Sequence, residues 1–114
     1  MENVIYNELR MRGYKVDVGV VQVAERDEKG KVVRKQYEVD FVCNLGSTRY
    51  YIQSAFSLPD AAKREQEIRP YRKIDDSFKK IVVTKDIVPA QYDENGILTL
   101  NIYDFLLDPK SIEK

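Results

Sequence analysis

The chain has 114 residues, of which 43% are hydrophobic and 33% are charged, and this balance predicts one globular core rather than a disordered segment. Its 19 basic and 19 acidic side chains cancel, so bulk charge does not indicate a nucleic-acid partner. Histidine is absent and there is one cysteine, which excludes Ser-His-Asp catalysis, a paired-cysteine zinc site and an intrachain disulfide.

The first element is predicted to be a helix, because apolar side chains recur at helical spacing as far as Leu9 and Gly13 is suited to end it. Two valine-rich segments, 14–24 and 32–43, follow as strands. The charged segment 25–31 is expected to be the hairpin loop between them.

The second and third strands alternate in polarity, so each is expected to present two distinct faces. In the second strand one face holds Tyr37, Val39, Phe41 and Cys43, and the other holds Glu38 and Asp40. The third strand, 49–56, begins after a glycine-containing turn. It should place Tyr51, Gln53 and Ala55 on one face.

The next helix is predicted to start at a cap supplied by Ser57 or Asp60 and to run to about Arg69, where Pro70 ends or kinks it. The apolar segment 80–84 is then a short buried strand. The predicted order is thus a helix, a three-strand meander, a crossover helix and a strand. This order is typical of an α/β fold with a mixed sheet.

The tail adds one more strand, 97–102, after a hairpin-type turn at Asn95-Gly96. Segment 103–107 is expected to be a helical turn, and the last residues are expected to fray. We find no linker or repeat, so one domain should span 1–114. No apolar run reaches the ~18 residues of a membrane span and no signal-peptide pattern is present, so we expect cytoplasmic residence without a membrane partner.

Four positions carry the chemistry that remains open to the chain. Glu8 lies at the edge of the first helix's apolar face, and Asp40 lies in mid-strand, where propensity disfavours aspartate. Gln53 and Ala55 follow on the neighbouring strand. A helix acid, a strand aspartate and an acid-x-lysine pattern resemble the PD-(D/E)XK, or restriction-endonuclease-like, nucleases. In that superfamily the carboxylates hold Mg²⁺ and the lysine orients the attacking water.

Four segments in order resemble one family more closely: Glu2–Leu9, Glu38–Phe41, Tyr51–Gln53 and Asp104–Leu107. This family is the uncharacterised C-terminal domain that follows the ATPase module of many bacterial and archaeal AAA-type ATP-binding proteins. The resemblance implies that the chain is the excised C-terminal domain of a longer ATPase, whose upstream module is its partner and binds the ATP. This sequence has no phosphate loop of its own. The loop motif G-x-x-x-x-G-K could end only at Gly30-Lys31, and its first glycine would then fall at position 25, which is Glu25.

Carried onto this sequence, Glu8 matches the helix acid and Asp40 matches the metal-binding aspartate. Gln53 replaces the second acid and Ala55 replaces the lysine. Losing one charge-stabilising group typically raises a reaction barrier by about 3–4 kcal/mol. We therefore expect a degenerate site with at most weak Mg²⁺ binding, and an accessory role in assembly or recognition.

Several alternatives stay open at this point. Lys63 or Arg64, one turn into the second helix, could replace the missing lysine and restore a Mg²⁺-dependent DNA endonuclease. Glu8 and Asp40 could instead be a structural hydrogen-bonding pair, and the chain could be a stand-alone protein–protein adaptor. An oligomer is compatible with the sequence. The nuclease resemblance makes one geometric prediction, that Glu8, Asp40 and Gln53 converge within a few ångströms.

The segment from Lys63 to Lys80 is a second candidate surface, for DNA phosphates. It holds seven basic residues, Lys63, Arg64, Arg69, Arg72, Lys73, Lys79 and Lys80, against four acidic ones, Glu65, Glu67, Asp75 and Asp76. This local excess favours phosphate contacts, although a solvated helix face accounts for it equally well.

Overall fold

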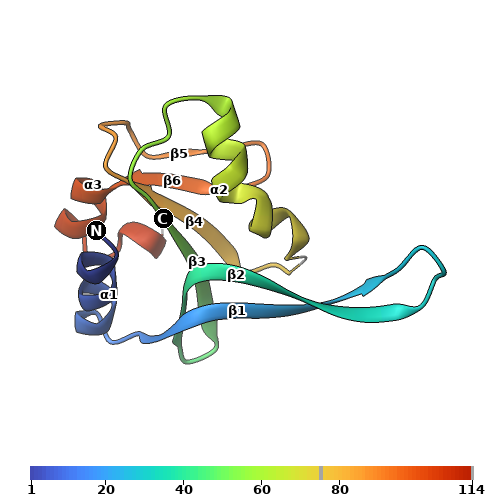
Figure 1. The fold of residues 1–114 in the computed structure, drawn as a ribbon. Coiled ribbons are helices and arrows are strands. Elements are labelled where there is room, and N and C mark those ends of the chain that lie inside the picture. Colours follow the sequence, from blue (N-terminus) through green and yellow to red (C-terminus); the bar gives the residue numbers. More distant parts are fainter. Residues whose placement is uncertain (75, 114) are drawn as a thin grey trace.

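The computed structural model describes residues 1–74 and 76–113. Within these ranges six strands form one mixed sheet in the order β1-β2-β3-β4-β6-β5 (Figure 1). The strands are β1 (Lys15–Arg26), β2 (Val32–Leu45), β3 (Thr48–Ala55), β4 (Lys79–Thr84), β5 (Gln91–Tyr92) and β6 (Leu98–Asn101). The helices are α1 (Glu2–Met11), α2 (Ala61–Lys73), α3 (Ile102–Leu107) and the short 3₁₀ helix η1 (Ser111–Glu113).

The topology confirms the predicted fold class. Strands β1, β2 and β3 form an antiparallel meander, and α2 then crosses to β4, which runs parallel to β3. The extra strand β6 is parallel to β4, and the two-residue β5 pairs antiparallel with β6. Strand β5 was not predicted, because two residues carry no periodicity. None of the described helices is long and apolar enough to cross a membrane.

Two apolar cores lie on opposite faces of the sheet. One contains Ile5 and Leu9 of α1 with buried residues of α3 and η1, and the other contains Ile68 and Tyr71 of α2. Helix α1 ends as predicted at Gly13, which has a φ of 95°. The amides of residues 13 and 14 then donate to carbonyls of the last helical turn, which stops the helix.

Helix α2 departs from its prediction at its C-terminal end. Asp60 caps its start by accepting from the Lys63 amide at 2.8 Å, as expected. However, the helix continues through Pro70 to Lys73. The hydroxyl of the buried Tyr71 donates to the Ile81 carbonyl at 2.7 Å, so contacts with the sheet hold the last turn despite the lost helical hydrogen bond.

The expected fraying of the C-terminal segment is also wrong for the described residues. Ser111 and Ile112 are buried, and Arg12 at the end of α1 donates to the Ser111 hydroxyl at 3.2 Å and to the Asp108 carbonyl at 3.0 Å. Arg12 also donates to the carbonyl of Phe105. This arginine therefore fastens the C-terminal segment against α1.

A β-bulge at Asp40 breaks the alternation that was expected in β2. Val18 pairs with Phe41 but Gly19 pairs with Val39, so Asp40 is an extra residue on β2. As a result Phe41 packs in the core under α1, whereas Val39 packs in the core under α2. The prediction that Val39 and Phe41 share a face is therefore wrong.

Strand β3 keeps a regular alternation, as expected. Tyr50 and Ile52 pack in the core under α1, while Tyr51 and Ala55 pack in the core under α2. Beyond the bulge, β1 and β2 leave the body of the molecule as a two-stranded ribbon, residues 20–38, which Figure 1 shows projecting far to one side.

Candidate functional site

The bulge brings Asp40 next to Gln53 on β3. The Asp40 amide donates to the Gln53 side-chain oxygen at 2.7 Å, and the Ser54 amide donates to the Asp40 carboxylate at 2.7 Å. Two of the three residues predicted to converge therefore do so. The bulge also accounts for an aspartate in mid-strand, because the extra residue leaves the regular ladder and its carboxylate accepts from the neighbouring strand's backbone.

Gln53 connects this pair to α2. Its side chain is 7% exposed, and its amide nitrogen donates to the Glu67 carbonyl at 3.3 Å. A glutamate at this position would lose that donor and place carboxylate oxygen against carbonyl oxygen. The amide therefore fits the surroundings better than the acid of the nuclease motif would.

Glu8 does not join this cluster, so the prediction of a three-residue convergence is wrong. Its carboxylate lies 3.7 Å from Arg12, at the end of α1 that holds the C-terminal segment. The α1 acid beside Asp40 is Glu2, which lines the same hollow of about 280 Å³ as Asp40 and Glu38.

Helix geometry explains this error. Glu2 and Glu8 are six residues apart, which separates them by about 9 Å along the helix axis and by about a third of a turn around it. Glu8 borders the apolar face of α1, but position along the helix decides which acid reaches the bulge. An acid in the first turn was the signal that would have indicated Glu2.

The electrostatic surroundings of Asp40 disfavour its charge. Partial burial raises the pKa of the Asp40 carboxyl, and the charges of Glu2 and Glu67 raise it further. The hydrogen bond from the Ser54 amide acts in the opposite direction, but the net shift is upward. Three carboxylates thus share one region, and their mutual repulsion costs stability when all are ionised.

The resemblance to PD-(D/E)XK nucleases implies a Mg²⁺ ion, but this arrangement does not fit one. The Gln53 side-chain oxygen and the Oδ2 atom of Asp40 already accept the amides of Asp40 and Ser54. Among the described residues, no three acidic, cysteine or histidine side chains gather closely enough to hold an ion. We therefore derive no chemical step through a metal here.

Ala55 and Lys63 occupy different environments. Ala55 is 2% exposed and packs in the core under α2, where it offers no polar group. The Lys63 amino group lies 3.2 Å from the carboxylate of Glu67, the residue whose carbonyl binds Gln53. Arg64 points elsewhere, to Asp93 at 3.1 Å and to a threonine of β6. Of the two substitutes considered for the missing lysine, only Lys63 lies beside the site.

The basic segment from Lys63 to Lys80 is largely neutralised by its own neighbours. Within the described part of the chain, four of these basic residues form ion pairs: Lys63 with Glu67, Arg64 with Asp93, Arg72 with Glu65 and Lys80 with Asp76. Asp75, which was counted with this segment, lies outside the described residues. This pairing reduces the local excess of positive charge that favoured a DNA surface.

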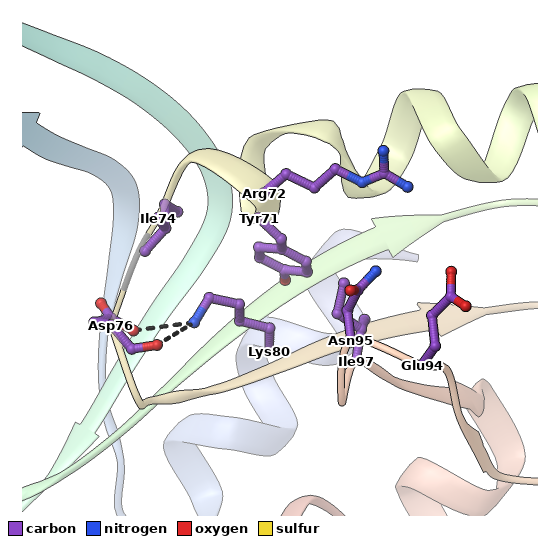
Figure 2. A pocket seen from close by; sticks show the side chains of 8 residues that line it. All are labelled: Tyr71, Arg72, Ile74, Asp76, Lys80, Glu94, Asn95 and Ile97. Carbon is purple, nitrogen blue, oxygen red and sulfur yellow. Dashed lines mark hydrogen bonds and ion pairs between the residues drawn. The ribbon is translucent and has the colours of Figure 1, made fainter. Parts of the chain in front are cut away.

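A larger hollow of about 660 Å³ lies away from Asp40, between the end of α2, the start of β4 and the β5–β6 turn (Figure 2). Figure 2 shows the Lys80 amino group bonded to Asp76, at 3.0 Å from the carboxylate and 3.1 Å from the carbonyl. Burial acts to raise the pKa of Asp76, but hydrogen bonds from Tyr51 and Lys80 outweigh it and lower that pKa. Tyr51 and Lys80 thus both donate hydrogen bonds to Asp76 and hold this end of the hollow together.

Comparison with known proteins agrees with the fold. The small subunit R.BspD6I2 of the heterodimeric restriction endonuclease R.BspD6I superposes with a TM-score of 0.50 at 13% identity, over 91% of this chain and 63% of that subunit. The chain thus has a restriction-endonuclease-like fold, as the resemblance of its motifs predicted.

Comparison of sequences gives a longer relative. A Haemophilus influenzae protein, described as uncharacterized, is 31% identical over 107 residues, which are 94% of this chain and 22% of that protein. The chain therefore spans about a fifth of the length of this relative. No family profile matches the chain.

Proposed function

We propose that this chain is a non-cleaving accessory domain of a larger protein and that its restriction-endonuclease-like site is degenerate. The observation that carries the proposal is the pairing of Asp40 with Gln53, in which the Gln53 oxygen and Oδ2 of Asp40 accept backbone amides. At the lysine position, Ala55 is buried in the core. Neither a metal shell nor a group that could polarise water is assembled at this point.

The longer relative supports the accessory role, because the matching region is a small part of that protein. On the sequence resemblance, the remainder would be an AAA-type ATPase module, and the domain would serve that module in assembly or in recognition of a partner. A small domain with its own two cores can fulfil such a role without chemistry.

A cleavage assay tests the central part of this proposal. The purified chain is incubated with supercoiled and branched DNA and with Mg²⁺ or Mn²⁺, beside the Asp40→Ala variant. We expect no cleavage above the buffer control in either sample. Strong cleavage by the wild type that disappears in Asp40→Ala would contradict the proposal.

A Mg²⁺-dependent endonuclease with a displaced lysine is the second candidate, and the position of Lys63 beside Glu67 favours it. If cleavage is found, Lys63→Ala should abolish it under this reading. Arg72→Ala is the matched control, since Arg72 is also an ion-paired residue of α2 but contacts Glu65. Weak cleavage that neither substitution changes would indicate a contaminating nuclease.

A further inference from the structure

Strand β1 is an edge of the sheet, and its middle part is unprotected. It is twelve residues long, and the segment 18–24 has no charge and no proline. Val18 is 82% exposed and Val20 is 54% exposed. Natural sheets usually protect such an edge with charges, prolines or covering loops, because the backbone groups of an edge strand pair readily with another strand.

The space beside this edge is open on both faces of the sheet. One hollow, of about 280 Å³, lies against Val18 and Val20 on the side of Glu2. Another, of about 270 Å³, lies along the same strand on the side of Arg49. Of the described residues that line these two hollows, Glu2 alone belongs to a helix.

We propose that β1 pairs antiparallel with β1 of a second copy of this chain, about a two-fold axis at Val20. In two strands related by such an axis, residue n of one copy lies opposite residue 40 − n of the other copy. Val20 then faces Val20, and Lys15 faces Glu25 of the second copy at both ends. The ladder joins two sheets and covers the exposed valines of each copy.

The pairing of charged side chains favours the register centred on Val20 over the neighbouring registers. An axis at Val21 would place Asp17 opposite Glu25 twice, which only the pairing of Lys15 with Asp27, just beyond the strand, would offset. An axis at Gln22 would place Asp17 opposite Asp27 and Lys15 opposite Lys29, each twice. Like charges directly opposite each other destabilise a ladder, whereas opposite charges stabilise it. An axis at Gly19 would bring no charged pair together.

Glu25 is held in position for this contact. Its carboxylate accepts from the Tyr37 hydroxyl at 2.6 Å and lies 3.6 Å from the Lys35 amino group, across the ribbon. The side chain of Lys15 is exposed at the other end of the strand. The ribbon of each copy would thus lie along the beginning of β1 of the other.

Sedimentation velocity over a range of concentrations tests the dimer. We expect a concentration-dependent dimer for the wild type and a fall of at least about tenfold in the association constant for Val20→Lys, since two ammonium groups would then face each other. Val32→Lys is the matched control, because Val32 is 58% exposed in the same ribbon but lies on β2. A monomeric wild type, or a Val20→Lys variant that dimerises like the wild type, would overturn the proposal.

Disulfide trapping tests the register. Val20→Cys should form an intermolecular disulfide on oxidation, because the two residues lie opposite each other across the axis. Val18→Cys is more exposed but should not, because its two copies would lie about 13 Å apart along the strands. Native Cys43 is fully buried and does not compete. Equal cross-linking of the two variants would contradict the register.

Discussion

Asp40 is the residue of the degenerate site whose ionised form costs the fold stability. Its pKa is raised above the ordinary value of 3.8 by burial and by the charges of Glu2 and Glu67. The stabilising contribution of this carboxyl is therefore fully present below that ordinary pKa and is lost as the pH rises through the raised value. At neutral pH the ionised carboxylate is a cost to the folded state.

Asp40→Asn should therefore stabilise the protein at neutral pH. The amide oxygen can still accept from the Ser54 amide, while the repulsion from Glu2 and Glu67 disappears. We expect the free energy of unfolding in urea to rise by less than about 1 kcal/mol, because solvent screens a carboxylate that is only partly buried. The gain should vanish below about pH 4.

Asp93→Asn is the control for this measurement. Asp93 pairs with Arg64 at 3.1 Å and accepts the amides of Asn95 and Ile97, so its substitution should destabilise the fold at neutral pH. If Asp40→Asn behaved like Asp93→Asn, Asp40 would be a structural residue and the account of a strained site would fail.

The proximity of Asp40 and Gln53 could be predicted from the sequence, because a short turn joins their strands and fixes the register. The position of Glu8 could not be predicted in the same way. Its neighbours depend on where α1 lies along the sheet, and this depends on Arg12 and the buried C-terminal segment.

At the scale of elements, the bulge in β2 determines the site. Its sequence signal lies on the other strand, in Gly19. A Cβ atom added there would lie 2.4 Å from the Val39 carbonyl oxygen and 3.0 Å from the Val42 side chain. Period-two reasoning applied to β2 alone could not reveal it, so the faces of Val39 and Phe41 were predicted incorrectly.

Gly19→Ala should disturb the bulge and the site together. The backbone of β2 must move to admit the methyl group, which we expect to lower the free energy of unfolding by about 1–3 kcal/mol. The Ser54 amide, which donates to Asp40, should change its chemical shift in a ¹⁵N NMR spectrum.

Gly46→Ala separates these two effects. Gly46 has a φ of 61° but nothing within 4 Å of an added Cβ, so its substitution strains the backbone without a clash. It should cost stability while leaving the Ser54 signal in place. An unchanged Ser54 amide in Gly19→Ala would mean that the bulge does not control the site.

At the scale of the whole molecule, the order of elements was sufficient to predict the fold. Helix, meander, crossover helix and parallel strand leave few arrangements that bury both faces of a sheet. The exact ends of α2 and of the chain were not predictable, since Tyr71 and Ile112 are held by contacts with distant residues.

The central claim is that backbone amides engage the Gln53 oxygen and one oxygen of the Asp40 carboxylate, so that the site holds no metal. It is tested most directly by ¹⁵N NMR during titration with Mg²⁺. We expect the amide signals of Asp40 and Ser54 to remain unshifted at saturating Mg²⁺, because their hydrogen bonds to Gln53 and Asp40 persist. A saturable shift centred on these two amides and absent from Asp40→Asn would show that the site opens to hold a metal, and would contradict the account.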